Sequence, residues 1–89
     1  MKKSTHTDEY TAIREELKSA RSSAKLTQRA LADLLEVNPS WVAKIESGER
    51  RVDLLEFCWV LDACERDPLV AFKRILTKVR QQPQSKRRN

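Results

Sequence analysis

Residues 26–49 read LTQRALADLLEVNPSWVAKIESGE and carry the clearest structural signals of the chain. It contains two short helical patterns, each with its own start signal. Thr27 is a favoured N-cap for the first helix, and Asn38 followed by Pro39 is a strong start for the second. Gly48, the only glycine of the chain, suits the left-handed position that ends the second helix. The sequence therefore predicts two helices joined by a very short turn.

These helices are expected over residues 28–35 and 39–47. Because the turn between them is short, they must cross steeply, so the second helix can project from the surface as a helix does in the DNA major groove. An apolar set at helical spacing faces inward and comprises Leu31, Ala32, Leu35, Val37, Val42 and Ile45. The outward face of the second helix carries Ser40, Ala43, Lys44 and Ser47.

Several of these positions occur together in a known family. Thr27-Gln28, Leu31-Ala32, Val37, Val42, Ile45-Glu46 and Gly48 resemble the lambda-repressor/Cro-like helix-turn-helix family, also called Xre. The resemblance extends over about residues 10–67. It implies an all-α, five-helix, lambda-repressor-like domain whose second and third helices form the helix-turn-helix. It also implies a regulator that binds double-stranded DNA.

The chain departs from the family pattern at two positions. Glu36 stands in the turn where the family usually has glycine, and a left-handed non-glycine residue costs on the order of 1 kcal/mol. We therefore expect a strained or reshaped turn. Trp41 replaces a small polar residue, and it either lies along a sugar-phosphate strand or packs sideways against a neighbouring helix or partner.

The resemblance assigns roles in DNA binding to individual residues. Those placed at the bases are Pro39, Ser40, Ala43 and Lys44, and Gln28, with Thr27 assisting, is placed at a phosphate. By their own positions in the chain, Trp41, Ser47, Arg50 and Arg51 are also expected at the phosphates. Lys44 is the best candidate for specificity, because an ammonium group suits the O6 and N7 acceptors of guanine. Thr27 has an alternative role as a simple cap, and Arg50 and Arg51 have one as a solvated loop.

A structural ion pair is implied between Arg21 and Glu46, which would fix the recognition helix on the first helix. If the pair is buried, loss of one partner would cost up to ~3–5 kcal/mol. Two unrelated surface charges are the alternative.

Three further helices complete the expected fold. The first runs from Asp8 or Glu9 to about Ala24, the fourth from Leu54 to about Cys64, and the fifth from Pro68 to about Arg80. Their expected inward stripes are Tyr10, Ile13, Leu17, Ala20 and Ala24; Leu54, Phe57, Leu61 and Cys64 with Cys58 beside them; and Leu69, Phe72, Leu76 and Val79 with Ile75 adjacent. Asp53 and Glu56 form a capping box, and Asp67 caps the fifth helix.

The fourth helix is apolar nearly all round, so a second face needs cover. Either the fifth helix folds back over it within one subunit, or the two helices form a symmetric dimer contact. The residues expected at a dimer interface are Leu55, Trp59, Ala63, Phe72, Ile75, Leu76 and Val79.

Length and charge give the domain organisation. The 89 residues are expected to form one domain over residues 8–80, between a disordered N-terminus, 1–7, and a basic disordered tail, 81–89. Residues 1–65 carry ten Lys and Arg against twelve Asp and Glu, whereas residues 66–89 carry eight against one. The tail either adds salt-sensitive attraction to phosphates or merely aids solubility. Without a secretion signal or membrane span, we expect a cytoplasmic, nucleoid-associated protein.

Catalytic and metal chemistry have no candidate residues. Cys58 and Cys64 lie on different faces of one expected helix and are interpreted as packed thiols, with redox sensing as the alternative. His6 is the only histidine, and no CxxC pair exists, so no metal site or cofactor is expected. We expect no enzymatic activity.

Two functions remain. The first is a sequence-specific, dimeric transcriptional repressor that binds a palindromic operator and is autoregulatory. The alternative is an antitoxin-type protein-interaction module that neutralises a partner protein, for which exposed Trp59 and Leu34 would be suited.

Overall fold

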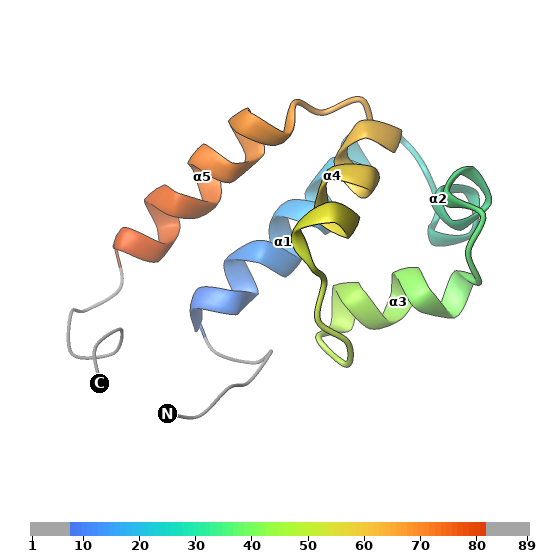
Figure 1. Cartoon of the computed structure of the whole chain (residues 1–89), viewed down its shortest axis with the longest axis horizontal. Coiled ribbons are helices and arrows are strands. Elements are labelled where there is room, and N and C mark those ends of the chain that lie inside the picture. Colours follow the sequence, from blue (N-terminus) through green and yellow to red (C-terminus); the bar gives the residue numbers. More distant parts are fainter. Residues whose placement is uncertain (1–7, 82–89) are drawn as a thin grey trace.

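The computed structural model describes residues 8–81, which form five helices and no strand (Figure 1). The helices are α1 (Asp8–Ser23), α2 (Gln28–Leu35), α3 (Pro39–Ser47), α4 (Leu54–Ala63) and α5 (Pro68–Arg80). The expected all-α, five-helix fold is confirmed. The expected N-terminal segment, 1–7, lies outside the described residues, as does the expected tail beyond Gln81. Within the described range, no helix has the length and apolar character needed to cross a membrane.

The predicted start signals operate as caps. The side chain of Thr27 accepts a hydrogen bond from the Ala30 N–H, and that of Asn38 accepts one from the Ser40 N–H. Asp53 and Glu56 form the complete capping box, and the Asp67 side chain accepts from the Leu69 N–H. Each side-chain oxygen satisfies an N–H group that the helix itself leaves without a partner.

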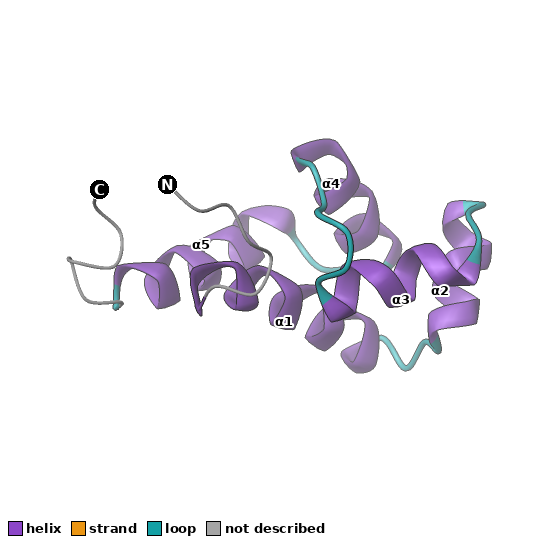
Figure 2. Cartoon of the chain, turned by 90° about the horizontal axis from the view of Figure 1, so that it is seen from below, coloured by secondary structure: helices purple, strands orange, loops and turns teal. Residues whose placement is uncertain are grey.

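The core lies where α1, α2, α3 and α4 meet. Its most deeply buried side chains are Leu17, Leu31, Val42, Ile45, Val60 and Leu61. α5 folds back along α1, and the α2–α3 pair lies at the other end of the molecule (Figure 1; Figure 2). The helix-turn-helix is therefore supported from behind by α1 and α4.

The apolar stripes predicted for α4 and α5 are partly wrong. Leu54 is 75% exposed, whereas Val60, outside the predicted stripe, is 1% exposed. On α5, Leu69 and Phe72 are 77% and 51% exposed. Ile75, expected beside the stripe, is buried together with Ala71, which the pattern did not include. Both helices are apolar on several sides, so the pattern could not select the inward face. Packing of α5 against α1 selects the face that carries the small Ala71.

A buried carboxylate fastens α5 to α1. Glu16, which is 4% exposed, accepts hydrogen bonds from Arg66 at 2.9 Å and Arg74 at 3.1 Å. Arg66 also donates to Ser23 of α1 at 3.2 Å. The network was not predicted from the sequence. A signal was present, because Glu16 lies one helical turn from Ala20 and therefore shares the inward face of α1.

The turn between α2 and α3 keeps the left-handed geometry that the family gives to glycine. Glu36 has φ 58° and ψ 43°, and its N–H donates to the carbonyl oxygens at the end of α2. The Val37 N–H donates to the Ala32 carbonyl at 3.0 Å, which closes the turn. The sequence left open whether this turn is strained or reshaped. The left-handed Glu36 corresponds to the strained turn. Gly48 adopts φ 88° at the end of α3, as predicted.

Introducing glycine at position 36 and removing glycine from position 48 should have opposite effects on the free energy of unfolding. Glu36→Gly removes the steric cost of a Cβ atom and should raise the free energy of unfolding by about 0.5–1 kcal/mol. Gly48→Ala introduces that cost and should lower it by about 1 kcal/mol. Urea denaturation followed by circular dichroism measures the free energy of unfolding of both variants. A loss of stability in Glu36→Gly would contradict backbone strain at this position.

Removing the charge of Glu16 should loosen α5. In Glu16→Gln, the amide cannot accept both guanidinium groups, and we expect a loss of about 1–3 kcal/mol in the free energy of unfolding. The matched control is Glu15→Gln on the exposed face of α1, with a change near zero. Equal stability of the two variants in thermal denaturation would show that the buried network is not structural.

Candidate nucleic-acid interface

The outward face of α3 is open to a ligand. Ser40, Lys44 and Ser47 are exposed, while Val42 and Ile45 on the opposite side are at most 1% exposed. Ala43 and Pro39 are half-buried at the edge of the same face. The residues expected at the bases thus lie together, uncovered by the rest of the described chain.

A buried ion pair holds this helix on α1. Arg21 Nε lies 2.7 Å from Glu46 Oε2, and Arg21 Nη2 lies 3.0 Å from Oε1. The side chains are 13% and 5% exposed, so water screens the pair only weakly. Hydrogen bonding to Glu46 raises the pKa of Arg21 above its ordinary value. Arg14, which sequence reasoning missed, donates to the Glu46 carbonyl oxygen at 3.1 Å and secures the end of α3.

Gln28 joins the same network from the start of α2. Its side-chain amide donates to Glu46 Oε1 at 3.0 Å. Because a carboxylate only accepts hydrogen bonds, the amide nitrogen must face Glu46, and its second N–H remains to donate elsewhere. Thr27 is occupied as the cap of α2 through Oγ1. The first N–H groups of α2 lie beside this amide and favour an anion.

Arg50 is held within the subunit. Its guanidinium donates to both carboxylate oxygens of Glu56, at 3.0 and 2.9 Å, and lies 5.3 Å from the centre of the Trp41 ring. Hydrogen bonding to Arg50 lowers the pKa of Glu56 below its usual value. The charge of Arg50 is therefore compensated, and the residue links α3 to the start of α4.

Arg51 differs from Arg50. It is exposed, and its guanidinium lies 5.2 Å from the centre of the Tyr10 ring. The Tyr10 hydroxyl accepts a hydrogen bond from the Val52 N–H at 2.9 Å, which ties the loop after α3 to α1. Among residues 8–81, Arg51 forms no salt bridge, so its charge is available to an outside anion.

Trp41 packs sideways, which is the second of the two alternatives left open by the sequence. Its half-buried ring rests against the core and faces α4, where it lines a hollow with Trp59. It does not project with Ser40 and Lys44, so assigning it to a phosphate is not supported by this geometry.

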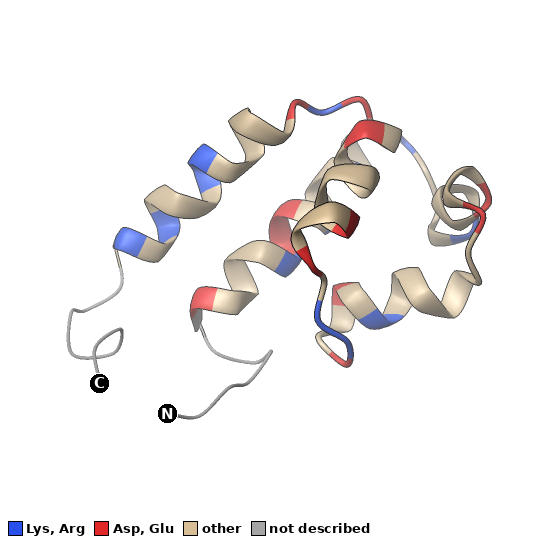
Figure 3. Ribbon diagram, in the orientation of Figure 1, with Lys and Arg blue, Asp and Glu red and all other residues tan. Residues whose placement is uncertain are grey.

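The charges are arranged unevenly over the molecule. Lys and Arg follow α5 and the loop after α3, while Asp and Glu gather near the end of α2 and at both ends of α4 (Figure 3). The outward face of α3 carries one positive charge, that of Lys44. A polyanion approaching α3 therefore meets Lys44 and the exposed Arg51, while Glu46 is buried. One exposed carboxylate, Glu49, follows α3 in the same loop and accepts a hydrogen bond from Ser47.

The residues expected at a dimer interface divide into two groups. Phe72 lies beside a small apolar hollow of about 220 Å³ between α4 and α5, next to Leu54. Trp59 and Ala63 line a different hollow between α2 and α4. Ile75 is only 6% exposed and packs in the core of the described chain, and its place at an interface stays a prediction. Leu55 is 58% exposed, and Leu76 and Val79 are half-buried.

The cysteines are free, and Cys64 is packed in the core. Cys64 is 6% exposed, and burial raises the pKa of its thiol, which disfavours the reactive thiolate. Cys58 is half-buried. Over residues 8–81, no group of three or more His, Cys, Asp and Glu side chains is placed to hold a metal ion.

Known proteins share this architecture. A family model described as a helix-turn-helix domain matches residues 12–71. Two crystal structures of point mutants of the restriction-modification controller protein C.Esp1396I, one in a trigonal form, each give a TM-score of 0.75 at 16% and 15% identity, over 84% of this chain and 100% of that chain. At this identity the likeness concerns the fold. No curated protein shows significant sequence similarity to the chain.

The family match covers more than half of the chain and includes every residue of α2, α3 and α4. The expected resemblance to lambda-repressor-like proteins is confirmed. The chain belongs to the helix-turn-helix domain family of DNA-binding regulators.

Proposed function

We propose that this protein is a sequence-specific transcriptional regulator that inserts α3 into the DNA major groove. The observation that carries the proposal is the outward face of α3, where Ser40 and Lys44 are exposed while the buried Arg21–Glu46 pair fixes the helix. A rigid helix with an uncovered polar face can hold base contacts in register. The protein C.Esp1396I, which shares the fold, is a restriction-modification controller, and this supports a regulatory role.

Base recognition rests on a small set of side chains. Lys44 donates to guanine O6 or N7, Ser40 donates to or accepts from a base edge, and Ala43 contacts a thymine methyl group, with Pro39 beside it. Arg, Asn and Gln are missing from α3, so few bidentate base contacts are available. Sequence-dependent DNA shape therefore contributes part of the discrimination.

Phosphate contacts flank this set. Gln28 donates its second amide N–H to one strand, assisted by the first N–H groups of α2. Ser47 and Arg51 reach the other strand. Arg50 positions the loop through Glu56 and Trp41, because its own charge is already compensated.

The proposed regulator is a homodimer that binds a palindromic operator as a repressor and controls its own promoter. The exposed apolar side chains on the α4–α5 side, Leu54, Leu69 and Phe72, supply the dimer contact, with Leu55, Leu76 and Val79 around them. Two-fold symmetry requires half-sites spaced by one helical turn, about 10 bp. Such a protein resides at the nucleoid.

Lys44→Ala and Arg51→Ala should separate base recognition from phosphate binding. On an operator selected from a random duplex pool, Lys44→Ala should cost about 1–3 kcal/mol and relax the preference at one position. Arg51→Ala should weaken binding to all sequences alike and reduce the salt slope by about 1. Fluorescence anisotropy at several salt concentrations measures both effects. An equal loss on every sequence for both variants would exclude Lys44 from base recognition.

Two exposed aromatic residues test which surface makes the dimer. Phe72→Glu on the α4–α5 side should convert the dimer to a monomer and lower operator affinity at least ~10-fold, because a buried unpaired charge opposes association. Trp59→Glu, on the α2–α4 side, is the matched control and should remain dimeric. Analytical ultracentrifugation gives the masses; a monomeric Trp59→Glu beside a dimeric Phe72→Glu would place the interface on α2 and α4.

A further inference from the structure

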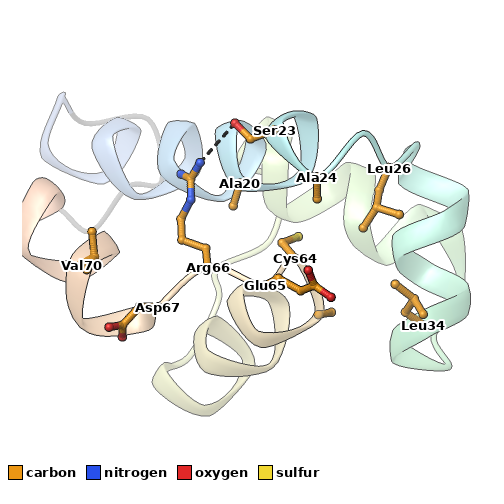
Figure 4. A pocket seen from close by; sticks show the side chains of 11 residues that line it. Ala20, Ser23, Ala24, Leu26, Leu34, Cys64, Glu65, Arg66, Asp67 and Val70 are labelled. Atoms are coloured by element: carbon orange, nitrogen blue, oxygen red, sulfur yellow. Dashed lines mark hydrogen bonds between the residues drawn. The ribbon is translucent and has the colours of Figure 1, made fainter.

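A trough begins between α2 and α4 and continues beside the end of α1 to the α4–α5 loop and the start of α5. It consists of two adjoining hollows, of about 650 and 470 Å³, which share Leu34 and Ala63 in their walls. Figure 4 shows the larger hollow, with Leu34 at the α2 end and Val70 at the α5 end. Trp41 and Trp59 line the smaller one. We call the two hollows together the α2–α4 trough.

Large apolar side chains of the trough are open to solvent. Leu34 is 59% exposed, Trp59 is 51% exposed and Val70 is 46% exposed. None of the three belongs to the cluster of buried side chains that forms the core. Contiguous exposed apolar surface of this kind marks a site of protein association, and tryptophan is a common anchor in such sites.

The uncompensated charges around the trough are negative. Glu36, Asp62 and Glu65 line it and are exposed, and none of them forms a salt bridge within residues 8–81. Three other charged groups line the trough. Glu56 pairs with Arg50, and Arg66 pairs with Glu16, a carboxylate that it shares with Arg74. Asp67 is a fourth exposed carboxylate, whose side chain caps α5. An occupant must therefore combine apolar side chains with positive charge.

This chemistry discriminates among occupants. DNA is repelled by the carboxylates, and it offers no apolar side chains for Trp59 and Leu34. The tail of the chain, residues 82–89, carries Lys86, Arg87 and Arg88, but it has no large apolar residue to fill the floor. A second copy of the chain has the apolar hollow between α4 and α5 as its proposed contact, and that hollow lies apart from the trough.

We propose that the α2–α4 trough docks a cationic amphipathic helix of another protein. Apolar side chains of that helix lie between Leu34 and Trp59, and its Lys or Arg side chains meet Glu36, Asp62 and Glu65. The exposed α3 residues Ser40, Lys44 and Ser47 do not line the trough. The protein can therefore hold DNA and this partner together, and the proposal stands independently of the proposed operator.

Synthetic peptides test the chemistry with the full-length protein. The first is a 14-residue helix, about 21 Å long, with a Leu face flanked by Lys and Arg. The second replaces each Lys and Arg by Glu, and the third scrambles the first to remove its apolar face. Only the first should bind saturably, with one peptide per chain. Trp41 and Trp59 both line the trough, so their indole N–H signals in NMR spectra report binding directly.

Matched variants locate the binding site. Asp62→Lys should weaken the cationic peptide about 10-fold, whereas Glu15→Lys, an equal charge reversal on the exposed face of α1, should leave it within about 2-fold. Leu34→Ala should weaken it, while Leu69→Ala, at a more exposed leucine of α5 that lies outside the trough, should not. Glu36→Gly provides a variant that keeps or gains stability and still loses one trough carboxylate, so weakened peptide binding there reflects charge alone.

The results separate this proposal from the DNA-binding proposal. Equal binding of the cationic and anionic peptides, or equal effects of Asp62→Lys and Glu15→Lys, would overturn it. So would a dimer that dissociates in Leu34→Ala, because the occupant would then be a second copy. A protein that binds no peptide but still binds its selected operator would refute the trough and leave the α3 assignment intact.

Discussion

Glu46 is the constraint on which the binding surface depends. It is a nearly buried carboxylate on the recognition helix, and three groups from elsewhere in the fold converge on it: the guanidinium of Arg21, the amide of Gln28 and, at its backbone carbonyl, Arg14. A buried charge is tolerated only when its hydrogen bonds are complete. The requirement to satisfy Glu46 therefore sets the position of α3 relative to α1 and α2.

A second carboxylate performs the same task at the other end of α1. Glu16 receives Arg66 from the α4–α5 loop and Arg74 from α5, so α5 cannot rotate without exposing or orphaning the charge. Helix α1 is thus a common support that carries α3 on one part of its surface and α5 on another. The outward face of α3 and the apolar α4–α5 side are thus both positioned by one helix.

Arginine has two distinct roles around α3. Arg50 is neutralised by Glu56 and stacked on Trp41, which makes it part of the scaffold. Arg51, its neighbour in sequence, keeps an exposed charge beside the Tyr10 ring. Two adjacent residues of the same type therefore differ in function because one faces a carboxylate at the start of α4 and the other does not.

The helices and their ends could be predicted from the residues alone, because caps, the Asn38-Pro39 start and Gly48 act through local backbone geometry. The sequence also indicated the partners Arg21 and Glu46 through the family resemblance. Only the tertiary structure decided which faces of α4 and α5 turn inward, since Leu54 and Val60 are equally apolar and periodicity cannot rank them. The roles of Glu16, Arg14 and Arg50 were decided in the same way, because a charged residue becomes structural only when folding brings a distant partner within hydrogen-bonding distance.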